Sequence, residues 1–148
     1  MSIDLIGVNH RCAPLALRER LAALGGRAAS DAVAQAGRAE FVVLSTCNRF
    51  ELYAPTGRAD ADGRPGLTEL LDRLGGGPGS ASAHAYRLRG REAAAHLFRV
   101  AAGLDSLVLG ETEILGQVRS SYEAARDAGR TEKRMNVLFQ RALFVGKA

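Results

Sequence analysis

The chain has 148 residues, 47% of them hydrophobic, which is enough for one domain with its own apolar core. No apolar stretch reaches the roughly 18 residues of a membrane span, and the N-terminus does not resemble a secretory leader, so we expect a soluble, cytoplasmic protein. The net charge of +4 permits contact with a phosphate backbone but does not require it, and two cysteines are too few for a disulfide framework.

Strand and helix patterns alternate over the first ninety residues. Strand patterns cover residues 3–8, 41–44, 50–53 and 83–88. Helical spacing covers residues 15–24, ended by Gly25-Gly26, then residues 30–35 after an N-cap at Ser30, and residues 67–74. In the third strand, Phe50 and Leu52 are predicted on one face, with Glu51 and Tyr53 on the other. Polar, glycine-rich segments separate these elements.

From residue 91 onward the sequence predicts helices. Three apolar stripes mark them: Ala94, Leu97, Phe98 and Ala101; Ile114, Leu115, Val118, Tyr122 and Ala125; and, after an N-cap at Thr131, Met135, Leu138, Phe139 and Ala142. The βαββαβ order before them predicts an α+β, ferredoxin-like sheet with helices on one face over about residues 1–90, followed by a helical subdomain over about 91–148. We expect one domain, residues 1–148, that is the N-terminal part of a longer protein, because the last helix shows no stop signal.

Cys47 is the residue with the clearest chemical potential. A thiolate is the reactive form of cysteine, and a free thiol with a pKa of about 8.5 needs positive potential nearby to form it at neutral pH. Arg49 would lie on the same side as Cys47 in an extended segment. From the residues alone, an inert buried cysteine at a strand end is the better interpretation. A metal site of His10, Cys12 and Cys47 lacks the paired spacing of zinc sites, and a cytosolic disulfide between the two cysteines is disfavoured.

Four segments together change that interpretation. Residues 7–20 (G-V-N-H-R-C-A-P-L-A-L-R-E-R), 42–53 (V-V-L-S-T-C-N-R-F-E-L-Y), 96–118 (H-L-F-R-V-A-A-G-L-D-S-L-V-L-G-E-T-E-I-L-G-Q-V) and 136–147 (N-V-L-F-Q-R-A-L-F-V-G-K) resemble successive signature blocks of glutamyl-tRNA reductase. The resemblance implies that Cys47 attacks the ester of glutamyl-tRNA to form a thioester. Hydride from NADPH then gives glutamate-1-semialdehyde for tetrapyrrole (porphyrin, haem) biosynthesis.

The resemblance also implies roles for further residues. Cys47 and His96 match catalytic residues, and His96 lies off the stripe of Leu97 and Phe98, so it need not be a core histidine. Implied substrate contacts are Thr46, Asn48, Arg49, Ser106, Glu111, Thr112, Glu113 and Gln117. Arg49 suits the substrate's side-chain carboxylate because a guanidinium can bind it through two N–H groups. Two positions depart from the family pattern, since Glu113 stands in place of Gln and Phe50 in place of a small or β-branched residue.

The cofactor and partners follow from the same resemblance. No G-x-G-x-x-G loop occurs in the chain, so the NADPH-binding and dimerisation domains are expected beyond its end. Implied partners are glutamyl-tRNA, a second copy in the full-length homodimer, and glutamate-1-semialdehyde aminomutase. Two other functions remain open from the residues: a non-catalytic module that binds tRNA or a partner, and an unrelated thiol acyltransferase or redox sensor.

Overall fold

The computed structural model describes residues 3–46, 48–56, 65–104 and 113–147. Its strands are β1 (Ile3–Asn9), β2 (Val42–Ser45), β3 (Arg49–Pro55) and β4 (Tyr86–Arg89). Its helices are α1 (Leu15–Gln35), α2 (Leu67–Gly75), the 3₁₀ turn η1 (Ser82–His84), α3 (Arg91–Ala101), α4 (Glu113–Asp127) and α5 (Lys133–Lys147). The chain is therefore a mixed α/β structure, as the alternating patterns predict.

The four strands form one antiparallel sheet in the order β2-β3-β1-β4. β1 lies in the middle and pairs with β3 on one side and with β4 on the other. Gly7 of β1 is consequently the cross-strand partner of both Glu51 in β3 and Tyr86 in β4. This register places a residue without a side chain between two large polar ones.

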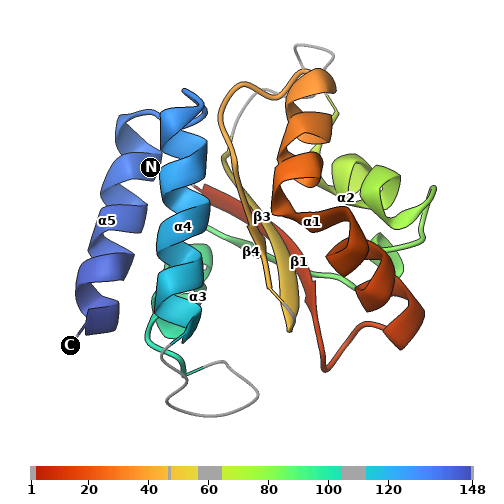
Figure 1. Cartoon of the computed structure of the whole chain (residues 1–148), viewed down its shortest axis with the longest axis horizontal. Coiled ribbons are helices and arrows are strands. Elements are labelled where there is room, and N and C mark those ends of the chain that lie inside the picture. Colours follow the sequence, from red (N-terminus) through yellow and green to blue (C-terminus); the bar gives the residue numbers. More distant parts are fainter. Residues whose placement is uncertain (1–2, 47, 57–64, 105–112, 148) are drawn as a thin grey trace.

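Helices cover both faces of the sheet (Figure 1). On one face, α1 and α2 pack on strand residues that include Ile6, Val8 and Leu52. On the opposite face, α3, α4 and α5 pack on residues that include Leu5, Val42 and Tyr53. The expected sheet with helices on one face accounts for α1 and α2 only. Because the strands are apolar on both sides, each face has to be covered, and α3–α5 form the third layer.

Three element boundaries differ from the sequence expectation. α1 is interrupted where Gly25-Gly26 predicts an end, because Gly25 takes φ 78° and ψ 162°, a non-helical conformation that glycine adopts without steric cost, but its second part begins before Ser30. Ser30 lies inside this helix and is not an N-cap. β4 begins at Tyr86 because the preceding residues form η1. α5 begins at Lys133, so Glu132 and not Thr131 directly precedes it, and the Thr131 hydroxyl donates to the Asn136 side chain at 2.7 Å.

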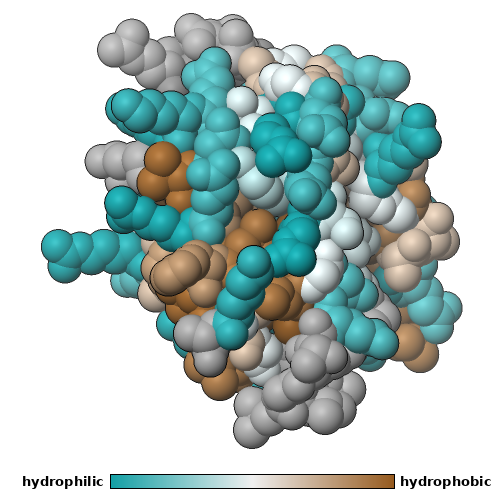
Figure 2. All heavy atoms as spheres, turned by 60° about the vertical axis from the view of Figure 1, so that its left-hand side comes forward, coloured by the Kyte–Doolittle hydropathy of each residue, from teal (hydrophilic) through white to brown (hydrophobic). Residues whose placement is uncertain are grey.

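Some apolar side chains remain at the surface on the side of α5 (Figure 2). Phe144 is 78% exposed and Val145 is 43% exposed, whereas Leu138 and Phe139 of the same helix are buried. Among the described residues, no helix is both long and apolar enough to cross a membrane.

Candidate active site

The turn from β2 to β3 is organised by Thr46. Its hydroxyl oxygen accepts hydrogen bonds from the backbone N–H groups of Asn48 (3.1 Å) and Arg49 (3.2 Å). Its own N–H donates to the Arg49 carbonyl at 2.9 Å. A hydroxyl that accepts from following N–H groups is a local turn-forming device, so the Thr46 side chain shapes the S-T-C-N-R turn. Cys47, within this turn, lies outside the described residues.

The loop after β1 lies against this turn. The N–H of His10 donates to the Asn48 carbonyl at 2.9 Å. Cys12 is an exposed free thiol whose sulfur accepts from the Asn9 N–H at 3.3 Å. Within the described ranges there is no group of three or more potential metal-ligating side chains.

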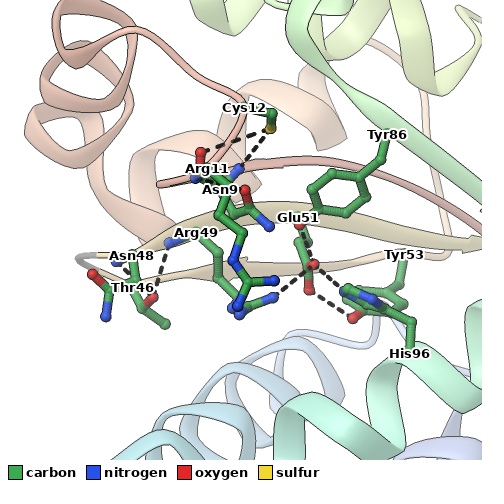
Figure 3. Close-up of polar contacts among 10 residues, drawn as sticks. All are labelled: Asn9, Arg11, Cys12, Thr46, Asn48, Arg49, Glu51, Tyr53, Tyr86 and His96. Atoms are coloured by element: carbon green, nitrogen blue, oxygen red, sulfur yellow. Dashed lines mark hydrogen bonds and ion pairs between the residues drawn. The ribbon is translucent and has the colours of Figure 1, made fainter. Parts of the chain in front are cut away.

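Arg49 begins β3 and turns its side chain into the protein. The residue is only 3% exposed, and its Nη1 lies 3.3 Å from Oε2 of Glu51 (Figure 3). The family resemblance predicts that Arg49 binds a substrate carboxylate. In the structure, Arg49 contacts the buried carboxylate of Glu51.

Glu51 is fully buried and is the common acceptor for four side chains. Oε1 accepts from the Tyr53 hydroxyl at 2.7 Å. Oε2 accepts from Arg49, from the Tyr86 hydroxyl at 2.5 Å, and lies 2.5 Å from Nε2 of His96 (Figure 3). We call these five residues the Glu51 cluster. It joins β3, β4 and α3 through one carboxylate.

The electrostatics favour a charged carboxylate with neutral phenols. Burial alone would raise the pKa of Glu51, but the hydrogen bond and charge of His96, the charge of Arg49 and the hydrogen bond from Tyr86 lower that pKa below its ordinary value. Burial, together with the negative charge of Glu51, raises the pKa of Tyr53 and of Tyr86. Both tyrosines therefore stay protonated and act as donors.

Gly7 provides the space in which Glu51 and Tyr86 meet. A Cβ at this position would lie 2.7 Å from Cγ of Glu51 and 3.2 Å from the Tyr86 hydroxyl oxygen. Any larger residue would push these two side chains apart. A glycine inside a strand often marks such a close approach, and this signal in the sequence could have identified the site.

His96 lies in the protein interior, which corrects the expectation that it sits off the apolar stripe. It is 5% exposed, and α3 buries Ala93, Leu97, Val100 and Ala101 on the same side. Ala94 and Phe98, which define the predicted stripe, are only half-buried. The buried face of α3 is therefore rotated from the predicted one, and this rotation brings His96 onto Glu51.

The remaining predicted site residues are not part of the Glu51 cluster. Glu113, at the start of α4, is exposed, and Gln117, one turn later, is half-buried. Ser106, Glu111 and Thr112 lie outside the described residues. His84 is exposed on η1. Sequence reasoning missed Glu51 and Tyr86, because a single polar residue in a strand gives no indication of its partners.

Comparisons with known proteins agree on one family. Residues 6–148 match the family described as Glutamyl-tRNAGlu reductase, N-terminal domain. Curated glutamyl-tRNA reductases from Desulforudis audaxviator and Polaromonas naphthalenivorans are 43% and 44% identical over 99% of the chain, which covers 33% and 35% of those proteins. The structure of glutamyl-tRNA reductase from Methanopyrus kandleri superposes with a TM-score of 0.75 and 33% identity, over 98% of this chain and 33% of that one. The chain thus spans about a third of the length of these relatives.

Proposed function

The chain belongs to the glutamyl-tRNA reductase N-terminal domain family, and on that premise we propose that it performs the acyl-transfer half of glutamyl-tRNA reduction. The observation that supports this best is the Glu51 cluster, which brings two residues implied by the family, Arg49 and His96, onto one carboxylate. Both belong to signature segments, and Arg49 follows Cys47 by two residues.

In the proposed step, the Cys47 thiolate attacks the carbonyl carbon of the glutamyl ester. A carbon–sulfur bond forms, the carbon–oxygen bond to the tRNA ribose breaks, and the ribose oxygen takes up one proton, which balances the proton that the Cys47 thiol released on ionising. No oxidant or reductant is needed, because a thioester has the same oxidation level as the ester it replaces. A thiolate suits this step since it is nucleophilic without a strong base beside it.

Arg49 is the proposed ligand of the substrate's side-chain carboxylate. A guanidinium can bind a carboxylate through two N–H groups, and the contact with Glu51 through Nη1 orients the one of Arg49. His96 is proposed to position or polarise the ester carbonyl. Further proposed substrate contacts are Thr46, Asn48, Ser106, Glu111, Thr112, Glu113 and Gln117.

Reduction of the thioester with NADPH to glutamate-1-semialdehyde is proposed for the longer protein only. The glycine-rich segment, residues 75–79, follows the C-terminal end of α2 and leads into η1. It leads into a 3₁₀ turn and not into the N-terminus of an α-helix, where a dinucleotide pyrophosphate binds, so this segment does not have the form of such a site. The homodimer and the aminomutase are likewise proposed for the longer protein.

We also propose that residues 1–148 form a single domain and that the protein is located in the cytoplasm. For the fold, we propose the ferredoxin-like arrangement. Its support is the βαββαβ element order together with the antiparallel strand order β2-β3-β1-β4.

The test is to trap the acyl-enzyme. The chain is incubated with glutamyl-tRNA labelled in the glutamate, quenched in acid and separated on an acid gel. We expect a labelled, thiol-labile adduct that is absent from Cys47→Ser and retained by Cys12→Ser, which removes the other cysteine. An adduct that survives Cys47→Ser would contradict the proposal. Binding of the tRNA by the unsubstituted chain without any adduct would identify a binding module instead.

A further inference from the structure

We propose that Glu51 is a positioning residue for the acyl transfer: it holds His96 in the form protonated on Nε2, so that Nδ1 is the nitrogen available to the reaction, and it orients the guanidinium of Arg49. This inference rests on the proposed function for its role in catalysis. The assignment of the His96 proton rests on geometry alone.

Glu51 acts as a hydrogen-bond acceptor toward His96. An ionised carboxylate has lone pairs but no hydrogen to donate. Nε2 of His96 lies 2.5 Å from Oε2 of Glu51, which is hydrogen-bonding distance. Since Glu51 can only accept, Nε2 must be the donor, and in a neutral imidazole the proton then sits on Nε2 and the lone pair on Nδ1. The Arg49 guanidinium and the two tyrosine hydroxyls, which all donate to Glu51, support the ionised form.

The carboxylate of Glu51 and the ring of His96 are held in place by several contacts. The donors to Glu51 come from β3, β4 and α3, so the carboxylate cannot move without breaking contacts in three elements. The ring of Tyr86 also packs on that of His96, with centroids 5.4 Å apart and planes at 49°. The imidazole is therefore restrained both by a hydrogen bond and by a ring contact.

Arg49 and Glu51 form a buried pair of opposite charges. The side chains of Arg49 and Glu51 are 1% and 0% exposed, so their charges are almost entirely removed from water. Removing one partner of such a pair leaves an uncompensated buried charge. Without Glu51, we expect the guanidinium of Arg49 to turn toward solvent. The substrate carboxylate would then lose its proposed partner.

The experiment compares two substitutions at Glu51. Glu51→Gln keeps the shape and one acceptor oxygen but removes the charge, while Glu51→Met keeps the approximate volume and removes every acceptor. The tautomer of His96 is read from the nitrogen-15 NMR shifts of its ring. The rate constant of Cys47 acylation is measured in a single turnover with labelled glutamyl-tRNA, per folded molecule.

We expect Nε2–H in the unsubstituted chain and a loss of this preference in Glu51→Met. The acylation rate should fall by about 100-fold in Glu51→Met, at the low end of what a positioned proton-transfer group contributes, and by less in Glu51→Gln. Glu51→Gln also serves if the Met variant does not fold. The matched control is Asp72→Asn, which alters another buried, hydrogen-bonded carboxylate and should leave both readings unchanged.

Two results would overturn the inference: a His96 that carries a proton on Nδ1 in the unsubstituted chain, whether alone or together with one on Nε2, or unchanged acylation rates in both Glu51 variants. Failure of the proposed function is distinguishable from either. In that case the unsubstituted chain forms no adduct at all, while the NMR measurement still decides which nitrogen of His96 holds the proton.

Discussion

Two buried carboxylates, Glu51 and Asp72, are bound by different kinds of donor. Asp72, near the end of α2, accepts from the backbone N–H groups of Ala81 (3.0 Å) and Ser82 (2.7 Å), and from the Ser82 hydroxyl (2.8 Å). All of these donors lie within ten residues of it. Glu51 instead accepts from four side chains, one of them 45 residues away in the chain.

The difference separates a structural role from a chemical one. Backbone donors hold a local loop in place and have no further chemistry. Side-chain donors such as those of Arg49 and His96 can also meet a substrate, so a carboxylate that binds them arranges reactive groups. Buried charges are costly in either setting. We therefore expect substitutions around Asp72 to change stability alone, and substitutions around Glu51 to change both stability and acylation.

The largest effect is expected for Gly7→Ala. The new Cβ would lie 2.7 Å from Glu51 Cγ and 2.9 Å from the Phe50 carbonyl oxygen, so backbone or side chains must shift. We expect a loss of about 3 kcal/mol in the free energy of unfolding, the upper end of the range for overpacking. Urea denaturation measures the stability, and the acylation assay should show a slower reaction.

The control for this substitution is Gly26→Ala in α1. A Cβ there would meet only the Cβ of Ser45, at 3.7 Å, which is an ordinary contact. Gly26 opens the second part of α1, directly after the kink, so its exchange for alanine should change the free energy of unfolding by less than about 1 kcal/mol. Equal losses at Gly7 and Gly26 would mean that the space between Glu51 and Tyr86 is not what Gly7 provides.

A smaller effect is expected from the two tyrosines of the Glu51 cluster. Tyr53→Phe removes the donor to Oε1, whereas Tyr86→Phe leaves Oε2 with Arg49 and His96. An unsatisfied buried acceptor costs about 2 kcal/mol, but a lost hydrogen bond with remaining partners costs only about 1 kcal/mol. Thermal unfolding of both variants should rank Tyr53→Phe as the less stable. If Tyr86→Phe were instead the less stable variant, the donors to Oε1 and Oε2 of Glu51 would not be distributed as the structure indicates.

For Asp72→Asn we expect a loss of about 1 kcal/mol at neutral pH and, unlike for the Glu51 cluster, no change in acylation. Burial raises the pKa of Asp72, but hydrogen bonds from Ser82, Gly79 and Ala81 lower it below its ordinary value. A carboxyl whose pKa is lower in the folded state stabilises the protein above its unfolded pKa, about 4, and this contribution is lost as the pH falls further.

The free energy of unfolding of the unsubstituted chain should therefore decline as the pH falls from about 5 to 2. Asp72→Asn should make this decline shallower, because the substituted amide does not titrate. Denaturation curves at several pH values measure both slopes. If the free energy of unfolding has the same slope against pH in the two proteins, Asp72 does not contribute to the pH dependence.

The sequence predicted the strands and most helices because local periodicity determines them. Phe50 and Leu52 indeed face one core, while Tyr53 faces the other and Glu51 bonds to it. The partners of Glu51 were not predictable, since they depend on strand register and on the rotation of α3. His96 shows this most clearly: a small rotation of the helix brings it from a position off the predicted stripe to a buried one.

Tyr53 has a consequence for how the protein can be observed. Its hydroxyl binds Glu51, while its ring lies 5.4 Å from that of Phe139 in α5, edge to face. The chain has three tyrosines and no tryptophan, and two of those tyrosines donate to the same carboxylate. Two of the three tyrosines that dominate the near-ultraviolet absorbance of the unlabelled chain therefore lie beside Glu51. This gives the domain a built-in optical reporter of its polar centre and of the packing of its last helix.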